Sequence, residues 1–175
     1  MVFLDESGFL LQPLRRDTWG PVGEVLTRYA WDRHDRLSVI CALTVAPWAQ
    51  RFGLYYHFAP HNIQTTDVVQ FVREVHHHLR RTMIVIWDRW QVHRSAAAWF
   101  DRDAGDWLHV AWLPAYAPEL DPVEFVWTHA KYVDLVNWIP SNIQQVQDHL
   151  KDTLEDYRHD PSRLHSFFLT AKLDI

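Results

Sequence analysis

The apolar residues of this chain recur with two different periods, and each period predicts a different kind of element. Apolar and β-branched runs predict strands at residues 37–46, 54–58, 83–87 and 107–113. The run at 83–87 (MIVIW) is apolar at every position. Such a strand is typical of the centre of a parallel or mixed sheet that helices cover on both faces. A shorter apolar run at residues 2–4 ends at Asp5.

Helical spacing marks most of the remaining chain. Between Thr65 and Leu79 the apolar residues recur three and four positions apart, which predicts an amphipathic helix. Further helices are predicted at residues 94–101, 122–136 and 141–158, and a short apolar turn after Pro161. Turn-forming residues predict loops at 13–23 and 114–118. Early strands followed by alternating helices and strands indicate an α/β domain with a mixed sheet.

Length and composition add limits to this picture. The 175 residues suit one domain, with a core at about 1–136 and C-terminal helices at about 141–170. No apolar run approaches the ~20 residues of a membrane span, so no membrane partner is expected. The single cysteine, Cys41, excludes a disulfide framework and favours a cytoplasmic location. The net charge of −5 means that any nucleic-acid role needs a local basic patch or a separate module.

Two acidic residues, Asp5 and Asp88, directly follow apolar runs. Functional groups gather at the carboxyl ends of neighbouring strands in open α/β sheets. A buried carboxylate is costly unless a cation compensates it, and Mg²⁺ prefers oxygen ligands. A third acid would allow two ions about 4 Å apart, which clamp the attacking and leaving oxygens in a phosphoryl displacement.

Glu124 is the candidate for that third acid, and the local sequence supports two interpretations. Asp121 suits a helix N-cap, Pro122 suits the first helical position, and Glu124 would complete a capping box. Alternatively, Glu124, Thr128 and Lys131 share one side of the helix, which suits a metal ligand followed by a phosphate contact.

Four segments together resemble one protein family. They are DESGF at 5–9, WGPVG at 19–23, WDRWQVH at 87–93 and LPAYAPELDPVEFVW at 113–127. These segments are similar to the catalytic core of mariner-like bacterial insertion-sequence transposases, which belong to the DDE superfamily. The similarity covers about residues 1–135, and the spacing from Asp88 to Glu124 is close to that between the family's second and third acids.

The resemblance implies an RNase H-like, or retroviral-integrase-like, α/β fold. It implies that Asp5, Asp88 and Glu124 are catalytic metal ligands for two Mg²⁺ ions, with Mn²⁺ as a substitute. It also implies phosphodiester hydrolysis at transposon ends, strand transfer into target DNA, and a homodimer on double-stranded DNA. His93 and Lys131 match further family positions and are expected to contact DNA, as are the loop residues Arg15 and Arg16.

The sequence also departs from the family pattern. Arg89 and Asp121 stand where asparagine is usual, and Val22 replaces a common basic residue. The family's N-terminal helix-turn-helix part does not precede the first strand, so a separately encoded part is one expectation. Two alternatives remain open: an RNase H-like nuclease, or an inactive truncated transposase that serves only for binding or dimerisation.

Overall fold

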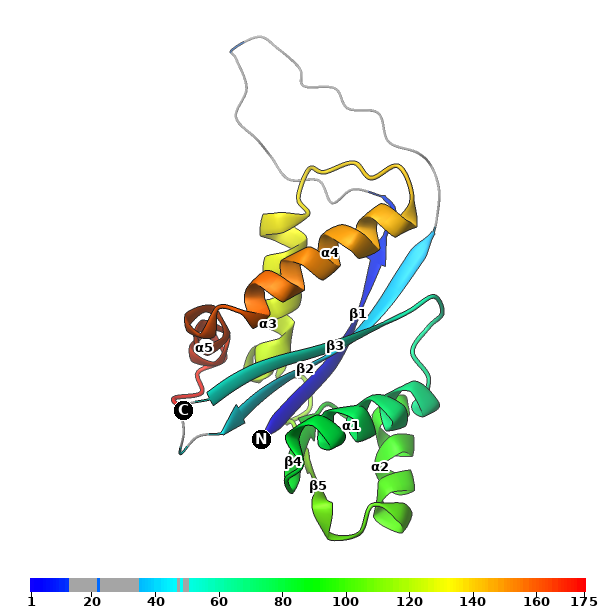
Figure 1. Cartoon of the computed structure of the whole chain (residues 1–175), viewed down its shortest axis with the longest axis vertical. Coiled ribbons are helices and arrows are strands. Elements are labelled where there is room, and N and C mark those ends of the chain that lie inside the picture. The colour runs from blue at the N-terminus through cyan, green and yellow to red at the C-terminus, as the bar shows by residue number, and fades with distance from the viewer. Residues whose placement is uncertain (13–21, 23–34, 47, 49–50) are drawn as a thin grey trace.

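A computed structural model describes residues 1–12, 22, 35–46, 48 and 51–175, and it contains a five-stranded sheet flanked by helices (Figure 1). The strands are β1 (Val2–Leu10), β2 (Arg36–Ala46), β3 (Arg51–Ala59), β4 (Met83–Trp87) and β5 (Leu108–Trp112). The helices are α1 (Thr65–Leu79), α2 (Gln91–Asp103), α3 (Pro122–His129), α4 (Ile143–Arg158) and α5 (Pro161–Thr170).

The sheet is mixed, with the strand order β3-β2-β1-β4-β5. β1, β2 and β3 form an antiparallel meander, whereas β4 and β5 run parallel to β1. β1 therefore lies at the centre of the sheet and pairs with a strand of each kind. Such a mixed sheet matches the predicted architecture.

β1 differs from the sequence prediction because it continues past Asp5 to Leu10. Asp5 therefore lies within a strand and not at its end. The polar run at 5–8 (DESG) has the composition of a turn, but β2 pairs with β1 along its whole length, from Val2 opposite Thr44 to Leu10 opposite Arg36. This continuous ladder satisfies the backbone hydrogen bonds of the polar run and keeps it extended.

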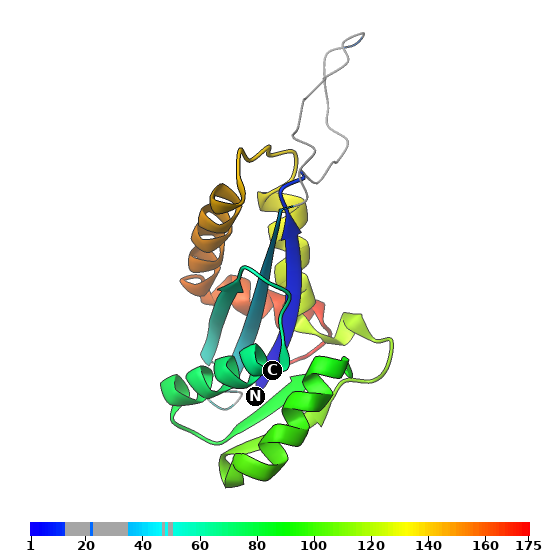
Figure 2. The ribbon, with the colours of Figure 1, turned by 90° about the vertical axis from the view of Figure 1, so that its right-hand side faces the viewer.

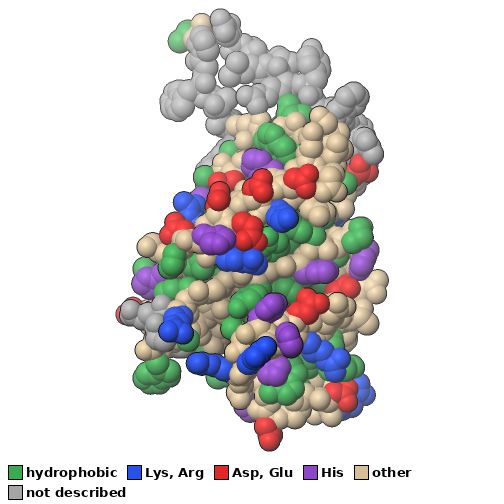
Figure 3. Space-filling view, viewed as in Figure 1, with side chains coloured by type: hydrophobic (Ala, Val, Ile, Leu, Met, Phe, Trp, Pro, Cys, Tyr) green, Lys and Arg blue, Asp and Glu red, His purple; other side chains and the backbone are tan. Residues whose placement is uncertain are grey.

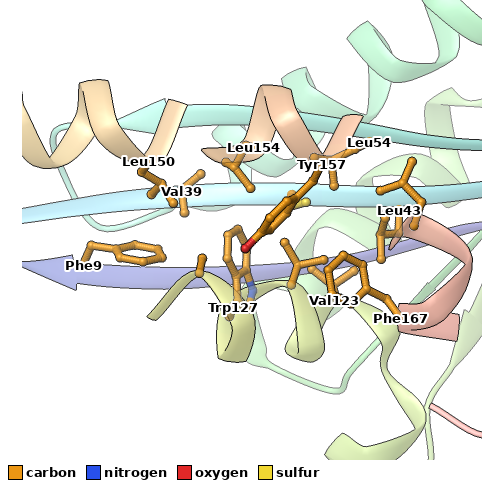
Figure 4. Close-up of a cluster of buried hydrophobic side chains, with 14 of the residues drawn as sticks. Phe9, Val39, Leu43, Leu54, Val123, Trp127, Leu150, Leu154, Tyr157 and Phe167 are labelled. Carbon is orange, nitrogen blue, oxygen red and sulfur yellow. The ribbon is translucent and has the colours of Figure 1, made fainter. Parts of the chain in front are cut away.

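Successive side chains of β1 point to opposite faces of the sheet, and each face has its own core. Val2 and Leu4 belong to a cluster with residues of α1 and α2. Phe3 and Phe9 belong to a second cluster with α3, α4 and α5. Figure 2 shows α1 and α2 grouped apart from the other three helices, and Figure 4 shows the second cluster between the strands and those helices. The alternation therefore assigns each residue of β1 to one helical layer.

Several predicted elements agree closely with the structure. The helix at 65–79 and the strand at 83–87 have the predicted bounds. The predicted helix at 122–136 is divided, because α3 ends at His129 and a π-helical turn follows over Ala130–Asp134. The predicted apolar turn after Pro161 is a full helix, α5. In the described part of the chain, no helix is both long enough and apolar enough to cross a membrane.

Candidate active site

Asp5, Asp88 and Glu124 lie on three different elements and line one cavity of about 450 Å³. The parallel pairing of β1 and β4 aligns Val2 with Val85 and Phe3 with Ile86. Continued by two residues, this register brings Asp5 beside Asp88, which directly follows β4. Glu124 reaches the cavity from the first turn of α3, which packs on β1. The fold therefore brings together three acids that are distant in the sequence.

A fourth acid, Asp121, lines the same cavity and is almost fully buried. Burial raises the pKa of Asp121 to about 7, and the nearby negative charges of Glu124 and Asp88 contribute to the rise. Burial also raises the pKa of Asp5 well above its ordinary value, with further contributions from the charges of Asp121, Glu6 and Glu124. The cavity therefore holds a group of acidic side chains that raise one another's pKa.

Asp5 and Asp88 both accept hydrogen bonds from neighbouring residues. The Nε1–H of Trp127 donates a hydrogen bond to Asp5 Oδ2 at 3.0 Å. Asp88 Oδ1 accepts hydrogen bonds from His93 Nδ1 at 2.7 Å and from the Trp90 backbone N–H at 2.9 Å. The bond from His93 lowers the pKa of Asp88, so this carboxylate is ionised at neutral pH. Hydrogen bonds from the protein therefore hold both carboxylates where they line the cavity.

The capping interpretation of Glu124 can be compared directly with the structure. Asp121 is the N-cap of α3, and its Oδ1 accepts a hydrogen bond from the Val123 N–H at 2.9 Å. Within the part of the chain that the structure describes, no hydrogen bond joins the Glu124 carboxylate to the Asp121 backbone. Asp121 thus caps the helix without a reciprocal bond, while Glu124 lines the cavity.

The chemistry of the cavity fits hard divalent cations such as Mg²⁺, which take oxygen ligands. Its acids are carboxylates, and their mutual repulsion would be relieved by a cation. Among the described residues, no three histidine, cysteine or acidic side chains lie close enough together to hold one ion. The carboxylates are instead spread along the cavity wall. This arrangement suits an ion that takes one or two protein carboxylates and completes its shell with water or phosphate.

His93 has a different place from the one expected. The residue is 0% exposed, and its ring stacks on Trp87 with ring centroids 5.0 Å apart. Its Nε2 lies 3.0 Å from the Glu6 carboxylate, and its Nδ1 contacts Asp88. Burial alone would lower the pKa of His93, but the two hydrogen bonds outweigh it and raise the pKa to about 10. With both ring nitrogens occupied inside the protein, a contact between His93 and DNA is not supported.

Lys131 lies in the π-helical turn and not on a continuous helix with Glu124. Its Nζ donates a hydrogen bond to Ser7 Oγ at 2.6 Å and lies 5.0 Å from the Phe9 ring centroid. It lines a second cavity of about 240 Å³ beside the end of β1. Burial lowers the pKa of Lys131. Arg15 and Arg16 lie outside the described residues.

The rim of the acidic cavity carries cationic and aromatic side chains. Arg89, Trp90 and Tyr116 line it, together with the proline-rich loop predicted at 114–118. Arg89 and Trp90 directly follow Asp88, and both are exposed. A cation and exposed rings beside a cluster of acids suit a ligand that carries phosphate and flat apolar groups.

Sequence reasoning missed three residues of this site. The local sequence marks Asp121 as a helix cap, although an acid three residues before Glu124 must lie near it. Glu6 directly follows Asp5, and a strand that ends at Asp5 gives Glu6 no role. Trp127 lies one turn after Glu124, and only the packing of α3 against β1 brings its N–H to Asp5.

Comparison with known proteins identifies the family of this chain. A family model described as DDE superfamily endonuclease matches residues 1–147. The chain belongs to the DDE superfamily endonuclease family. A search of curated proteins found no match. Membership in the DDE family agrees with the resemblance found in the sequence segments.

Solved structures of Mos1 transposase share the fold of this DDE family member. The Mos1 mariner paired-end complex with Mg has a TM-score of 0.69 and 16% identity, and the match covers 98% of this chain and 53% of the other. The paired-end complex with the left transposon end has a TM-score of 0.65 and 16% identity, and the match covers 97% of this chain and 55% of the other. The Mos1 catalytic domain has a TM-score of 0.56 and 13% identity, and the match covers 99% of this chain and 83% of the other. The chain thus spans about half the length of the Mos1 chains in the paired-end complexes, and the predicted RNase H-like α/β fold is confirmed.

Proposed function

We propose that this chain is the catalytic core of a DNA transposase, with residues 1–175 forming one domain. The observation that carries the proposal is the convergence of Asp5, Asp88 and Glu124 on one acidic cavity of a DDE-family fold. The proposed reaction is hydrolysis of a phosphodiester at a transposon end, followed by strand transfer into target DNA. Mos1 structures named as a paired-end complex and a strand transfer complex support the assignment through their shared fold.

Asp5, Asp88 and Glu124 would hold two Mg²⁺ ions, with Mn²⁺ as a substitute. Mos1 paired-end complexes with Mg and with Mn support the choice of metal. When bound, such ions activate the attacking oxygen and stabilise the leaving oxygen of a phosphodiester. The protein contributes the carboxylates of Asp5 and Asp88, which hydrogen bonds from Trp127 and His93 hold in place. Arg89 at the rim would attract a phosphate toward the cavity.

The partners of this core would be double-stranded DNA, a second copy of the chain, and a separately encoded helix-turn-helix part. Figure 3 shows acidic side chains along α4, and Lys and Arg side chains scattered elsewhere on the same face. DNA affinity based on charge needs clustered basic residues, so this face does not suit a DNA duplex. The acidic cavity and its cationic rim are the proposed DNA-binding side. The proposed location is the cytoplasm, which agrees with a free, buried Cys41.

The first test of this function is Mg²⁺ and Mn²⁺ binding measured by calorimetry on the wild type and the Asp88→Asn variant. The substitution removes a charged ligand but keeps the shape of the side chain, so binding is expected to be lost or strongly weakened. Asp101→Asn is the matched control, because Asp101 is exposed on α2 and does not line the cavity. Equal, negligible heats from the wild type and Asp88→Asn would remove the support for a metal-dependent enzyme.

The second test separates transposition from simple cleavage. DNA that carries the ends of the element encoding this chain would be incubated with the protein and Mg²⁺, and the products separated on a denaturing gel. A transposase is expected to cut the ends and to join them to a target duplex. Cutting without any joined product would instead assign the RNase H-like nuclease activity.

A further inference from the structure

The buried His93 lies between two acids that belong to different parts of the site. Its Nδ1 is 2.7 Å from Asp88 Oδ1, and its Nε2 is 3.0 Å from the carboxylate of Glu6. Both ring nitrogens therefore lie within hydrogen-bond distance of a carboxylate oxygen. The imidazole links β1 to the segment after β4.

The two acids that His93 links differ in their exposure to solvent. Adjacent residues of a strand point to opposite faces, so Asp5 faces α3 whereas Glu6 faces the layer of α1 and α2. The side chain of Glu6 is only 9% exposed, and that of Asp88 is 57% exposed. Glu6 thus anchors the ring from the buried side, and Asp88 remains open to the cavity.

Aromatic packing restricts the ring further. His93 lies parallel to Trp87, with an angle of 5° between the ring planes, and it meets Trp90 edge to face at a centroid distance of 5.7 Å. Trp87 is itself 0% exposed. Two hydrogen bonds and two ring contacts leave His93 one orientation, so the position of Asp88 Oδ1 is fixed in turn.

On the basis of the proposed function, we propose that Glu6 and His93 are positioning residues for the catalytic metal site. They hold Asp88 by Oδ1 so that Oδ2 is directed at the cation, and they act through Asp88 without contacting the metal or the DNA. Hydrogen-bond partners of this kind orient metal-binding carboxylates, and their loss reduces metal affinity or activity by about 10- to 100-fold.

The experiment is Mn²⁺ titration by calorimetry of the full chain and of the variants His93→Gln and Glu6→Gln. Both variants are expected to bind Mn²⁺ about 10- to 100-fold more weakly than the wild type. The matched control is His129→Gln, because His129 also contacts an acid and a tyrosine hydroxyl, Asp134 and Tyr157, but neither partner lines the acidic cavity. Thermal denaturation of every variant separates a loss of metal affinity from a loss of stability.

The possible results separate this inference from the proposed function. Wild-type affinity in both His93→Gln and Glu6→Gln, alongside lost binding in Asp88→Asn, would overturn the positioning role alone. An equal loss in His129→Gln would also overturn it, because the effect would then be general destabilisation. No Mn²⁺ binding by the wild type itself would remove the proposed function.

A measurement on the wild type keeps the inference testable if the variants do not fold. Nitrogen-correlated NMR of the histidine side chains reports the surroundings of each ring nitrogen. The His93 signals should shift when Mg²⁺ is added, because the ring contacts Asp88. His93 signals that do not respond to Mg²⁺ would contradict the positioning role.

Discussion

The substitution Asp121→Asn gives a direct measure of the negative charge in the cavity. Asp121 is 3% exposed, and burial beside Glu124 and Asp88 raises its pKa from 3.8 to about 7. Asparagine caps a helix about as well as aspartate, so the hydrogen bond from the Val123 N–H is retained. The substitution therefore removes a charge with little change in structure.

The expected magnitude follows from the shift in pKa. The folded chain binds this proton more tightly than the unfolded chain, so the wild type loses stability as the pH rises from about 4 to about 7. Each unit of pKa corresponds to 1.36 kcal/mol, so the loss is at most about 4 kcal/mol once both states are ionised. The variant does not ionise at this position and is spared that loss.

The assay is urea denaturation of both proteins between pH 4 and pH 8, with a chelator present. We expect nearly equal free energies of unfolding at pH 4, and an advantage for Asp121→Asn that grows to a few kcal/mol at pH 8. Adding Mg²⁺ at pH 8 should reduce the advantage, because a bound cation stabilises the charged form in the wild type. A difference that stays constant with pH, or a variant that is less stable at pH 8, would refute this reasoning.

Three further outcomes are expected. Trp127→Phe removes the indole N–H that donates a hydrogen bond to Asp5. The free energy of unfolding measured in urea should fall by at least about 1.5 kcal/mol, and the Mn²⁺ affinity should weaken. An unchanged Mn²⁺ affinity would show that this hydrogen bond does not orient Asp5. Tyr157→Phe removes the hydroxyl that donates to Asp134, and it should lower stability by about 1–3 kcal/mol without changing Mn²⁺ binding in calorimetry. Lys131→Gln should weaken DNA binding in a filter assay and reduce the slope of log affinity against log salt by about 1 if Lys131 contacts a phosphate. An unchanged slope would exclude that contact.

The sequence predicted the elements whose residues follow one period without interruption. α1 and β4 have the predicted bounds because their apolar residues repeat at helical spacing or fill every position. β1 and α3 were predicted less accurately because long-range contacts decide their ends. The polar run after Asp5 remains a strand only through its pairing with β2, and the π-helical turn after His129 has no signal in the local pattern.

The motif predicts the three acids that line the cavity, and the structure adds the side chains that contact them. A helix-start histidine five residues after Asp88 gives no indication that its ring is buried against Glu6. That contact requires the parallel alignment of β1 with β4 and the packing of α2 on the same face. The charge on Asp121 was visible in the sequence, but its effect depends on burial, which only the folded chain determines.

The extended ladder between β1 and β2 determines which of two adjacent acids faces α3 and the acidic cavity. Asp5 and Glu6 differ by one methylene group and by one position, so chemistry alone would accept either as a ligand. A slip of a single residue in this pairing would exchange their faces, sending the glutamate toward α3 and the aspartate toward the buried histidine. The alignment of the two strands therefore determines which acid lines the cavity, and a mutation in β2 that shifts this alignment would move Asp5 out of it while every acidic residue remains in the chain.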